Sequence, residues 1–149
     1  MNGNRKLDPA EELAYLRELY GNSDEKILRW ITGAYDILQA RSSMLLSLVA
    51  VVLTITGFSG PTIAASSMFS RICIGYGLSF VLIAAIIILA GPLQLRWATQ
   101  WRGDSIDDSL INLLRRRNAR TVKYHVAFFF LVIGLSGYVG SLIGFLFNR

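Results

Sequence analysis

YHVAFFFLVIGLSGYVGSLIGFLF, the stretch from Tyr124 to Phe147, decides the class of this protein. Between His125 and Asn148 the sequence contains no formally charged residue. At about 1.5 Å of rise per residue, a helix of this length crosses a hydrocarbon core roughly 30 Å thick, which takes about 20 apolar residues. The stretch is too long for an ordinary buried helix of a small soluble domain, so it predicts a membrane span.

The second half of this span carries small residues on one side. Four of them follow the spacing i, i+3, i+4 and i+7 and therefore share one helix face: Gly137, Gly140, Ser141 and Gly144. Small residues let two helix backbones approach closely in lipid, where the hydrophobic effect does not drive helices together. We expect this face to pack against another helix.

Two further charge-poor stretches, residues 42–70 and 72–95, precede this span and are separated only by Arg71. The first predicts a span from about Ser42 to Phe58, which Gly57, Gly60 and Pro61 should end. The segment 62–70 fits either a short interfacial helix or a loop. The second stretch predicts a span from about Ile72 to Leu95, with Gly91-Pro92 near its far end and Trp97 and Trp101 as interface anchors.

Amphipathic helices are predicted outside the spans. Asp8-Pro9 and Glu11 suit a helix start, Gly21 suits its end, and Leu13, Leu16 and Tyr20 share a face between them. A second helix should begin near Asn22 or Ser23 and continue unbroken into the first span. A third should open at Asp104 or Ser105, place Ile106, Leu110, Ile111 and Leu114 on one side, and run directly into the last span.

The fold class is therefore all-α, with three transmembrane helices and the first span continuous with a long N-terminal helix. The chain divides into an N-terminal helical region (1–41), two spans with a short external loop (42–95), a basic connector (96–123) and the third span (124–149). Thirteen lysines and arginines lie before the first span or in the connector, against two elsewhere. This bias predicts a cytoplasmic N-terminus and an external C-terminus.

A polar stripe follows the first span at helical spacing: Ser43, Ser47, Ala50, Thr54 and Gly57. One interpretation is a pore-lining face in an oligomer. The other is small-residue packing against span two or three, with the hydroxyl groups bonded to backbone carbonyls. The spans contain no acidic residue, so nothing indicates a proton relay or a buried cation site.

A basic run ends the connector: Arg115, Arg116, Arg117, Arg120 and Lys123. It could contact a phosphate-bearing ligand, anionic lipid or a soluble partner, or it could be the ordinary flanking charge of a span. No aromatic residues interleave with it, so no specific nucleic-acid binding is predicted. Acidic residues ahead of the first span, on the same predicted side, are candidates to pair with it: Asp8, Glu11, Glu12, Glu18, Asp24, Glu25 and Asp36.

The sequence offers little for catalysis. His125 is the sole histidine, and its spacing from Arg120 matches the R-x4-H pattern of HEPN ribonucleases, but it begins an apolar span where an RNA site would be awkward. Cys73 is the sole cysteine and reads as a small core residue. No phosphate-binding glycine loop or metal-ligand cluster is present, so we expect no catalytic site, no cofactor and no metal.

The junction into the first span, Gln39-Ala40-Arg41-Ser42-Ser43-Met44-Leu45-Leu46-Ser47, resembles small bacterial anti-phage membrane effectors, namely the Pycsar transmembrane effectors and SLATT-type families. Lys123-Tyr124-His125 before a glycine-rich last span is similar too. The resemblance implies a homo-oligomer that disrupts the inner membrane. The alternative is a non-conducting scaffold whose cytoplasmic helices recruit a soluble partner.

Overall fold

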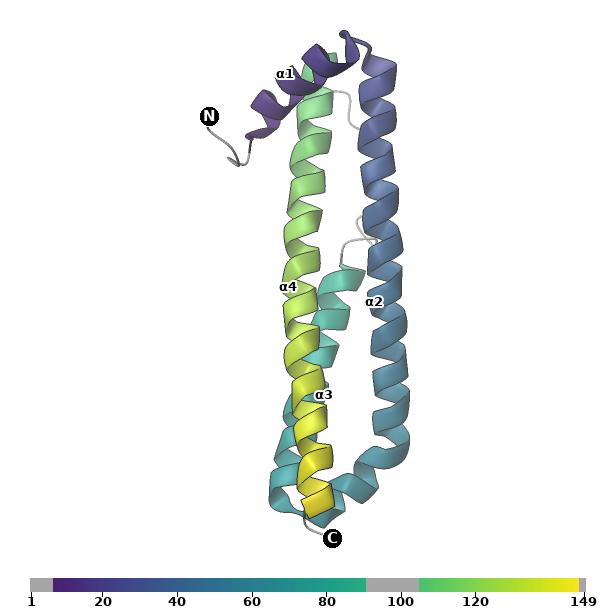
Figure 1. Cartoon of the computed structure of the whole chain (residues 1–149), viewed down its shortest axis with the longest axis vertical. Helices are drawn as coiled ribbons and strands as arrows, with labels where there is room; N and C mark the ends of the chain where they lie inside the picture. Colours follow the sequence, from purple (N-terminus) through teal and green to yellow (C-terminus); the bar gives the residue numbers. More distant parts are fainter. Residues whose placement is uncertain (1–6, 91–104, 148–149) are drawn as a thin grey trace. The chain divides into compact units, whose positions relative to one another are not determined.

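The computed structural model describes residues 7–90 and 105–147. These form four helices: α1 (Pro9–Tyr20), α2 (Asp24–Ser66), α3 (Met68–Leu89) and α4 (Ile106–Phe147) (Figure 1). Helices α2, α3 and α4 are long and apolar enough to cross a membrane. The all-α class with three spans is confirmed, and so is the continuity of the first span with a long N-terminal helix.

The chain forms two compact units. Unit 1 comprises residues 1–39 and 95–121, and unit 2 comprises residues 40–94 and 122–149. Helices α2 and α4 each contribute their first part to unit 1 and their second part to unit 2. The predicted boundaries at residues 41 and 123 thus fall inside continuous helices.

Local signals fix the ends of the helices in unit 1. Pro9 occupies the first turn of α1, and the Glu11 carboxylate accepts a hydrogen bond from the Asp8 backbone N–H at 3.1 Å. Gly21 ends α1 at φ +63°, a conformation that glycine adopts without steric cost. The Ser105 hydroxyl oxygen accepts a hydrogen bond from the Asp108 N–H at 3.0 Å, as an N-terminal cap does.

The core of unit 1 joins α1 to the first parts of α2 and α4. Each helix contributes two buried aliphatic residues: Leu13 and Leu16, Ile27 and Ile31, and Leu110 and Leu114. The spacing of three or four residues puts each pair on one face. Ile106 is exposed, so the predicted apolar side of α4 is shorter than expected.

Unit 2 is a three-helix arrangement. Helices α2 and α4 run in the same direction, and α3 runs in the opposite direction (Figure 1). Its core consists of aliphatic side chains from all three helices: Leu45, Val49, Val52, Val81, Ala84, Ile88, Ala127 and Leu131. This cluster is therefore packed with hydrocarbon, while Thr56, Ser70 and Ser141 are buried elsewhere in the unit.

The helix that contains the first span does not end where the sequence predicted. Helix α2 continues through Gly57, Gly60 and Pro61 to Ser66, and buries Ile63 on the way. Proline removes one backbone hydrogen bond and its ring crowds the carbonyl of Gly57, four residues earlier, yet the helix continues past it. Ser67 then caps α3, because its hydroxyl oxygen accepts a hydrogen bond from the Ser70 N–H at 3.1 Å. The segment 62–70 is thus helical except at Ser67.

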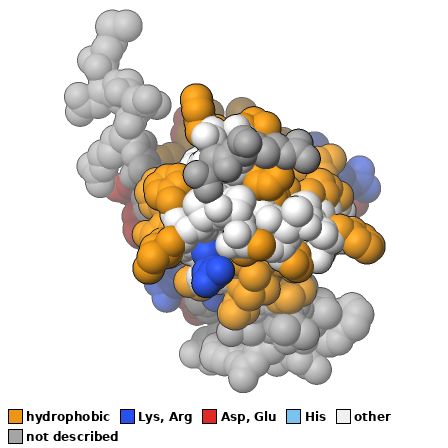
Figure 2. Space-filling model, turned by 90° about the horizontal axis from the view of Figure 1, so that it is seen from below, with side chains coloured by type: hydrophobic (Ala, Val, Ile, Leu, Met, Phe, Trp, Pro, Cys, Tyr) orange, Lys and Arg blue, Asp and Glu red, His pale blue; other side chains and the backbone are white. Residues whose placement is uncertain are grey.

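The helix of the second span begins at Met68, four residues before the predicted start of the span at Ile72, and ends at Leu89. Its predicted continuation to Leu95, the Gly91-Pro92 kink and the anchors Trp97 and Trp101 lie outside the described residues. In the three spanning helices, 28%, 22% and 22% of the most apolar window is buried inside the chain. Figure 2 accordingly shows many hydrophobic side chains on the surface. Most of the apolar surface is left for lipid or for other chains.

Candidate functional site

The small-residue face of α4 packs on α3. A Cβ atom added to Gly137 would lie 3.0 Å from the Gly77 Cα, and one added to Gly144 would lie 2.8 Å from the Phe69 ring. Gly140 has more space, with the Cys73 Sγ at 3.9 Å. Ser141 is fully buried, and its carbonyl accepts a hydrogen bond from the Ser70 hydroxyl at 3.3 Å. This face therefore holds the unit together.

Two glycines that the sequence analysis did not single out complete this contact. Gly134 lies one turn before Gly137 on α4, and Gly77 faces it from α3. A Cβ at Gly77 would be 2.7 Å from the Gly134 carbonyl oxygen. Gly134 continues the same helix face by three residues, so the spacing could have revealed it. Nothing in the sequence marks Gly77 as its partner.

The polar stripe of α2 faces away from this core. All five members, Ser43, Ser47, Ala50, Thr54 and Gly57, are exposed. The buried residues Leu45, Val49, Val52 and Thr56 occupy the opposite side of the helix. The stripe is thus turned away from the described helices α3 and α4 of its own unit.

The hydroxyl groups of the stripe bond within the helix. Ser47 donates to the Ser43 carbonyl at 3.1 Å, and Thr54 donates to the Ala50 carbonyl at 2.8 Å. Beside the stripe runs a second exposed row of large apolar side chains: Met44, Leu48, Val51, Ile55 and Phe58. Helix α2 therefore presents one small, polar row and one bulky, apolar row away from its own core.

The basic run does not form one continuous surface. Arg115 and Lys123 are exposed, whereas Arg116, Arg117 and Arg120 are half-buried. Lys123 belongs to unit 2 and the four arginines belong to unit 1. The Arg120 guanidinium lies over the Tyr35 ring, 5.1 Å from its centroid.

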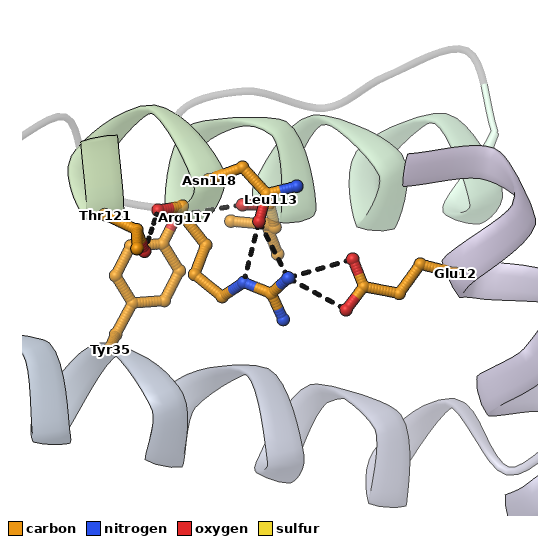
Figure 3. A network of polar contacts seen from close by, with 6 residues as sticks. All are labelled: Glu12, Tyr35, Leu113, Arg117, Asn118 and Thr121. Atoms are coloured by element: carbon orange, nitrogen blue, oxygen red, sulfur yellow. Dashed lines mark hydrogen bonds and ion pairs between the residues drawn. The ribbon is translucent and has the colours of Figure 1, made fainter. Parts of the chain in front are cut away.

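Arg117 is an internal tether of unit 1 (Figure 3). One guanidinium nitrogen donates to both carboxylate oxygens of Glu12, at 2.8 and 2.9 Å. The side chains of Arg117 and Glu12 are only 15% and 16% exposed. The guanidinium also lies 5.3 Å from the centroid of the Trp30 ring, which adds a cation–π contact. Arg117 thus links α1, α2 and α4.

A second ion-pair group ties α1 to its neighbours. Arg17 pairs with Asp107 at the start of α4 and with Asp24 at the start of α2, the latter at 3.1 Å. The hydrogen bond to Asp107 is the main cause that raises the pKa of the Arg17 guanidinium above its usual value. Carboxylates in the first turn also suit the positive end of a helix dipole. The expected pairing between N-terminal acids and the connector occurs at Glu12.

The Tyr35 phenol is half-buried in unit 1. Its hydroxyl donates to the Leu113 carbonyl at 2.9 Å (Figure 3). Burial raises the pKa of the Tyr35 phenol, and the positive charges of Arg120, Arg116 and Arg117 partly oppose that rise. The phenol is therefore held neutral as a hydrogen-bond donor.

Metal-ligating residues do not gather in residues 7–90 and 105–147: no three His, Cys, Asp or Glu side chains lie close enough to hold an ion. His125 is exposed on α4 beside the Tyr124 ring. Cys73 is half-buried on α3 near Gly140. The absence of enzymatic activity stays a prediction.

The three spans make this chain a multi-span helical membrane protein. Its best-defined contacts are the glycine packing of unit 2 and the arginine tether of unit 1. Comparison with protein-family models, curated proteins and solved structures finds no match.

Proposed function

We propose that this protein assembles through its membrane spans into a homo-oligomer that opens or perturbs the membrane. The observation that carries the proposal is the outward position of the small, polar row on α2, Ser43 to Gly57. The hydrophobic cluster that α2, α3 and α4 form in unit 2 is aliphatic and offers no polar path. A polar path has to be formed between chains, and this row is the surface suited to line or close it.

Because its hydroxyl groups are hydrogen-bonded within the helix, the row can face either water or an apolar neighbour. The Ser47 and Thr54 protons are used within the helix, so neither group is left unpaired in lipid or at a helix contact. Their oxygen lone pairs can still accept from water. The resemblance of residues 39–47 to membrane-disrupting effectors supports the same function.

The first test is the stoichiometry of the detergent-solubilised protein, by light scattering or native mass spectrometry. We expect a closed ring of about five or more subunits, because a central path needs several copies of this row around it and a monomer or dimer leaves no room for one. Bulky variants then test the row in liposomes: Ser47→Leu, Ala50→Leu and Thr54→Leu should lower ion flux with the ring intact. Val51→Leu, in the neighbouring apolar row, is the matched control. A monomer or dimer, or unchanged flux in an intact ring, would overturn the proposal.

The second candidate is a scaffold that recruits a soluble partner. Tyr15 and Leu19 favour it, because they are exposed one turn apart on the outer face of α1. Arg115 is exposed as well, whereas Arg117 is engaged with Glu12. A partner captured by the wild type but not by Tyr15→Ser or Arg115→Glu, with no ion flux in liposomes, would support this function instead.

A further inference from the structure

The charges of unit 2 have no counter-ion of their own. Residues 40–94 and 122–149 contain Arg41, Arg71, Lys123 and Arg149, but no aspartate or glutamate. Unit 1 differs, because Arg17 and Arg117 pair there with carboxylates. A cation beside hydrocarbon is costly unless an anion or water compensates it. Water or an anion from outside the unit therefore compensates the charges of unit 2.

Arg41 and Lys123 lie at the same end of unit 2. Arg41 precedes the core residue Leu45 by one helical turn, and Lys123 precedes the core residue Ala127 by one turn. Helices α2 and α4 run in the same direction, so both cations come before the same apolar core (Figure 1). Both side chains are exposed, and in the described part of the chain neither makes an ion pair.

Each of these cations stands next to an exposed apolar side chain. Met44 follows Arg41 by three residues, and Val126 follows Lys123 by three residues, so each pair shares one side of its helix. Both apolar residues lie toward the membrane-spanning part. A molecule with a phosphate at one end and a hydrocarbon chain at the other matches this order, because the phosphate reaches the cation while the chain lies along Met44 or Val126.

We propose that Arg41 and Lys123 bind the headgroup phosphate of anionic phospholipids in the leaflet at this end of unit 2. This site does not depend on the formation of a pore. It includes Arg41, which lies outside the basic run, and excludes Arg117, which Glu12 occupies. Inorganic phosphate lacks the hydrocarbon chain and would gain nothing from Met44 or Val126.

The test titrates phosphatidylglycerol, and phosphatidylcholine in parallel, into the detergent-solubilised full chain and counts bound lipids by native mass spectrometry. The wild type should bind phosphatidylglycerol more tightly than phosphatidylcholine. Arg41→Gln and Lys123→Gln should each weaken phosphatidylglycerol binding about fivefold, and the double variant about 25-fold. Arg41→Lys and Lys123→Arg keep the charge and should keep the affinity.

Lys26→Gln is the matched control, because Lys26 is an exposed lysine of unit 1 with no ion pair among the described residues. It should leave lipid binding unchanged. Circular dichroism checks that every variant keeps its helical content. Equal binding by wild type and double variant, equal loss in Lys26→Gln, or full competition by inorganic phosphate would each overturn the proposal.

Discussion

Gly77 on α3 and Gly134 on α4 meet backbone to backbone. A Cβ at Gly77 would lie 2.7 Å from the Gly134 carbonyl oxygen, and a Cβ at Gly134 would lie 2.8 Å from the Gly77 carbonyl oxygen. Both distances are shorter than a van der Waals contact between carbon and oxygen, and backbone atoms cannot rotate away as a side chain can. The close approach of the two spans therefore depends on both residues having no side chain.

Gly77→Ala and Gly134→Ala should each destabilise unit 2 by about 1–3 kcal/mol, because the added methyl group forces the two helices apart. Thermal unfolding in detergent, followed by circular dichroism, measures the effect. Gly75→Ala is the matched control on the same helix, since nothing lies within 4 Å of its added Cβ. A Gly134→Ala variant as stable as Gly75→Ala would contradict this account of the packing.

Glu12→Gln should loosen α1 from unit 1. The change keeps the shape of the side chain but leaves the Arg117 guanidinium largely buried without its carboxylate. Since both side chains keep some contact with water, we expect a loss of about 1–3 kcal/mol, below that of a fully buried pair. Hydrogen exchange at the amides of Leu13 and Leu16 reports it directly, because those residues leave the core when α1 detaches.

The pair of Glu25 and Arg29 provides the control for this tether. Its side chains are 85% and 83% exposed, at 3.8 Å and one turn apart on α2. Arg29→Gln should change stability by less than about 0.5 kcal/mol, as exposed pairs usually do. If Glu12→Gln proved equally silent, Arg117 would be a surface residue in effect and available to ligands.

Tyr35 makes the stability of unit 1 decrease at alkaline pH. Its pKa is raised in the folded state, so its contribution is fully present below the unfolded value of about 10 and is lost as the pH rises through the folded value. Subtracting the phenolate absorbance of Tyr35→Phe from that of the wild type isolates this residue. The midpoint should lie above 10; a midpoint at or below 10 would contradict the burial argument.

Tyr35→Phe should also cost about 0.5–1.5 kcal/mol at neutral pH, because the hydrogen bond to the Leu113 carbonyl is lost. Hydrogen exchange of the α2 and α4 amides of unit 1 measures this loss. Thr32→Val is the comparison on the same helix, since within residues 7–90 and 105–147 the exposed Thr32 hydroxyl bonds to carbonyls of its own helix. Equal effects of the two variants would assign no special role to the Tyr35 contact.

Periodicity was enough to predict the amphipathic helices and most of the core of unit 1. Leu13 with Leu16, and Leu110 with Leu114, follow a helical spacing, and these residues are buried. Periodicity could not predict that α2 continues past Pro61. A proline ends a helix or only bends it, depending on the groups around its ring and around the carbonyl that has lost its hydrogen-bond donor. The sequence signal at Gly57-Gly60-Pro61 is the same in both cases.

The division of the basic run shows where sequence reasoning stopped. Arg115, Arg116 and Arg117 are identical in chemistry, yet Arg117 follows the buried Leu110 and Leu114 on one face and therefore turns inward. That spacing was available in the sequence. Its partner Glu12 was not, because seven acidic residues precede the first span and only the fold selects one of them.

The distribution of basic residues predicts the orientation of the chain in the membrane. The rule that places basic loops in the cytoplasm counts lysines and arginines near span ends and gives acids little weight. Arg17 and Arg117 therefore still count although they pair with carboxylates, and thirteen lysines and arginines on one predicted side stand against two on the other. In a Cys73→Ser background, Asn148→Cys should react with a membrane-impermeant maleimide in intact spheroplasts, and Asn2→Cys only after permeabilisation. The reverse labelling pattern would show the opposite orientation, and labelling of both sites in intact spheroplasts would contradict an odd number of spans.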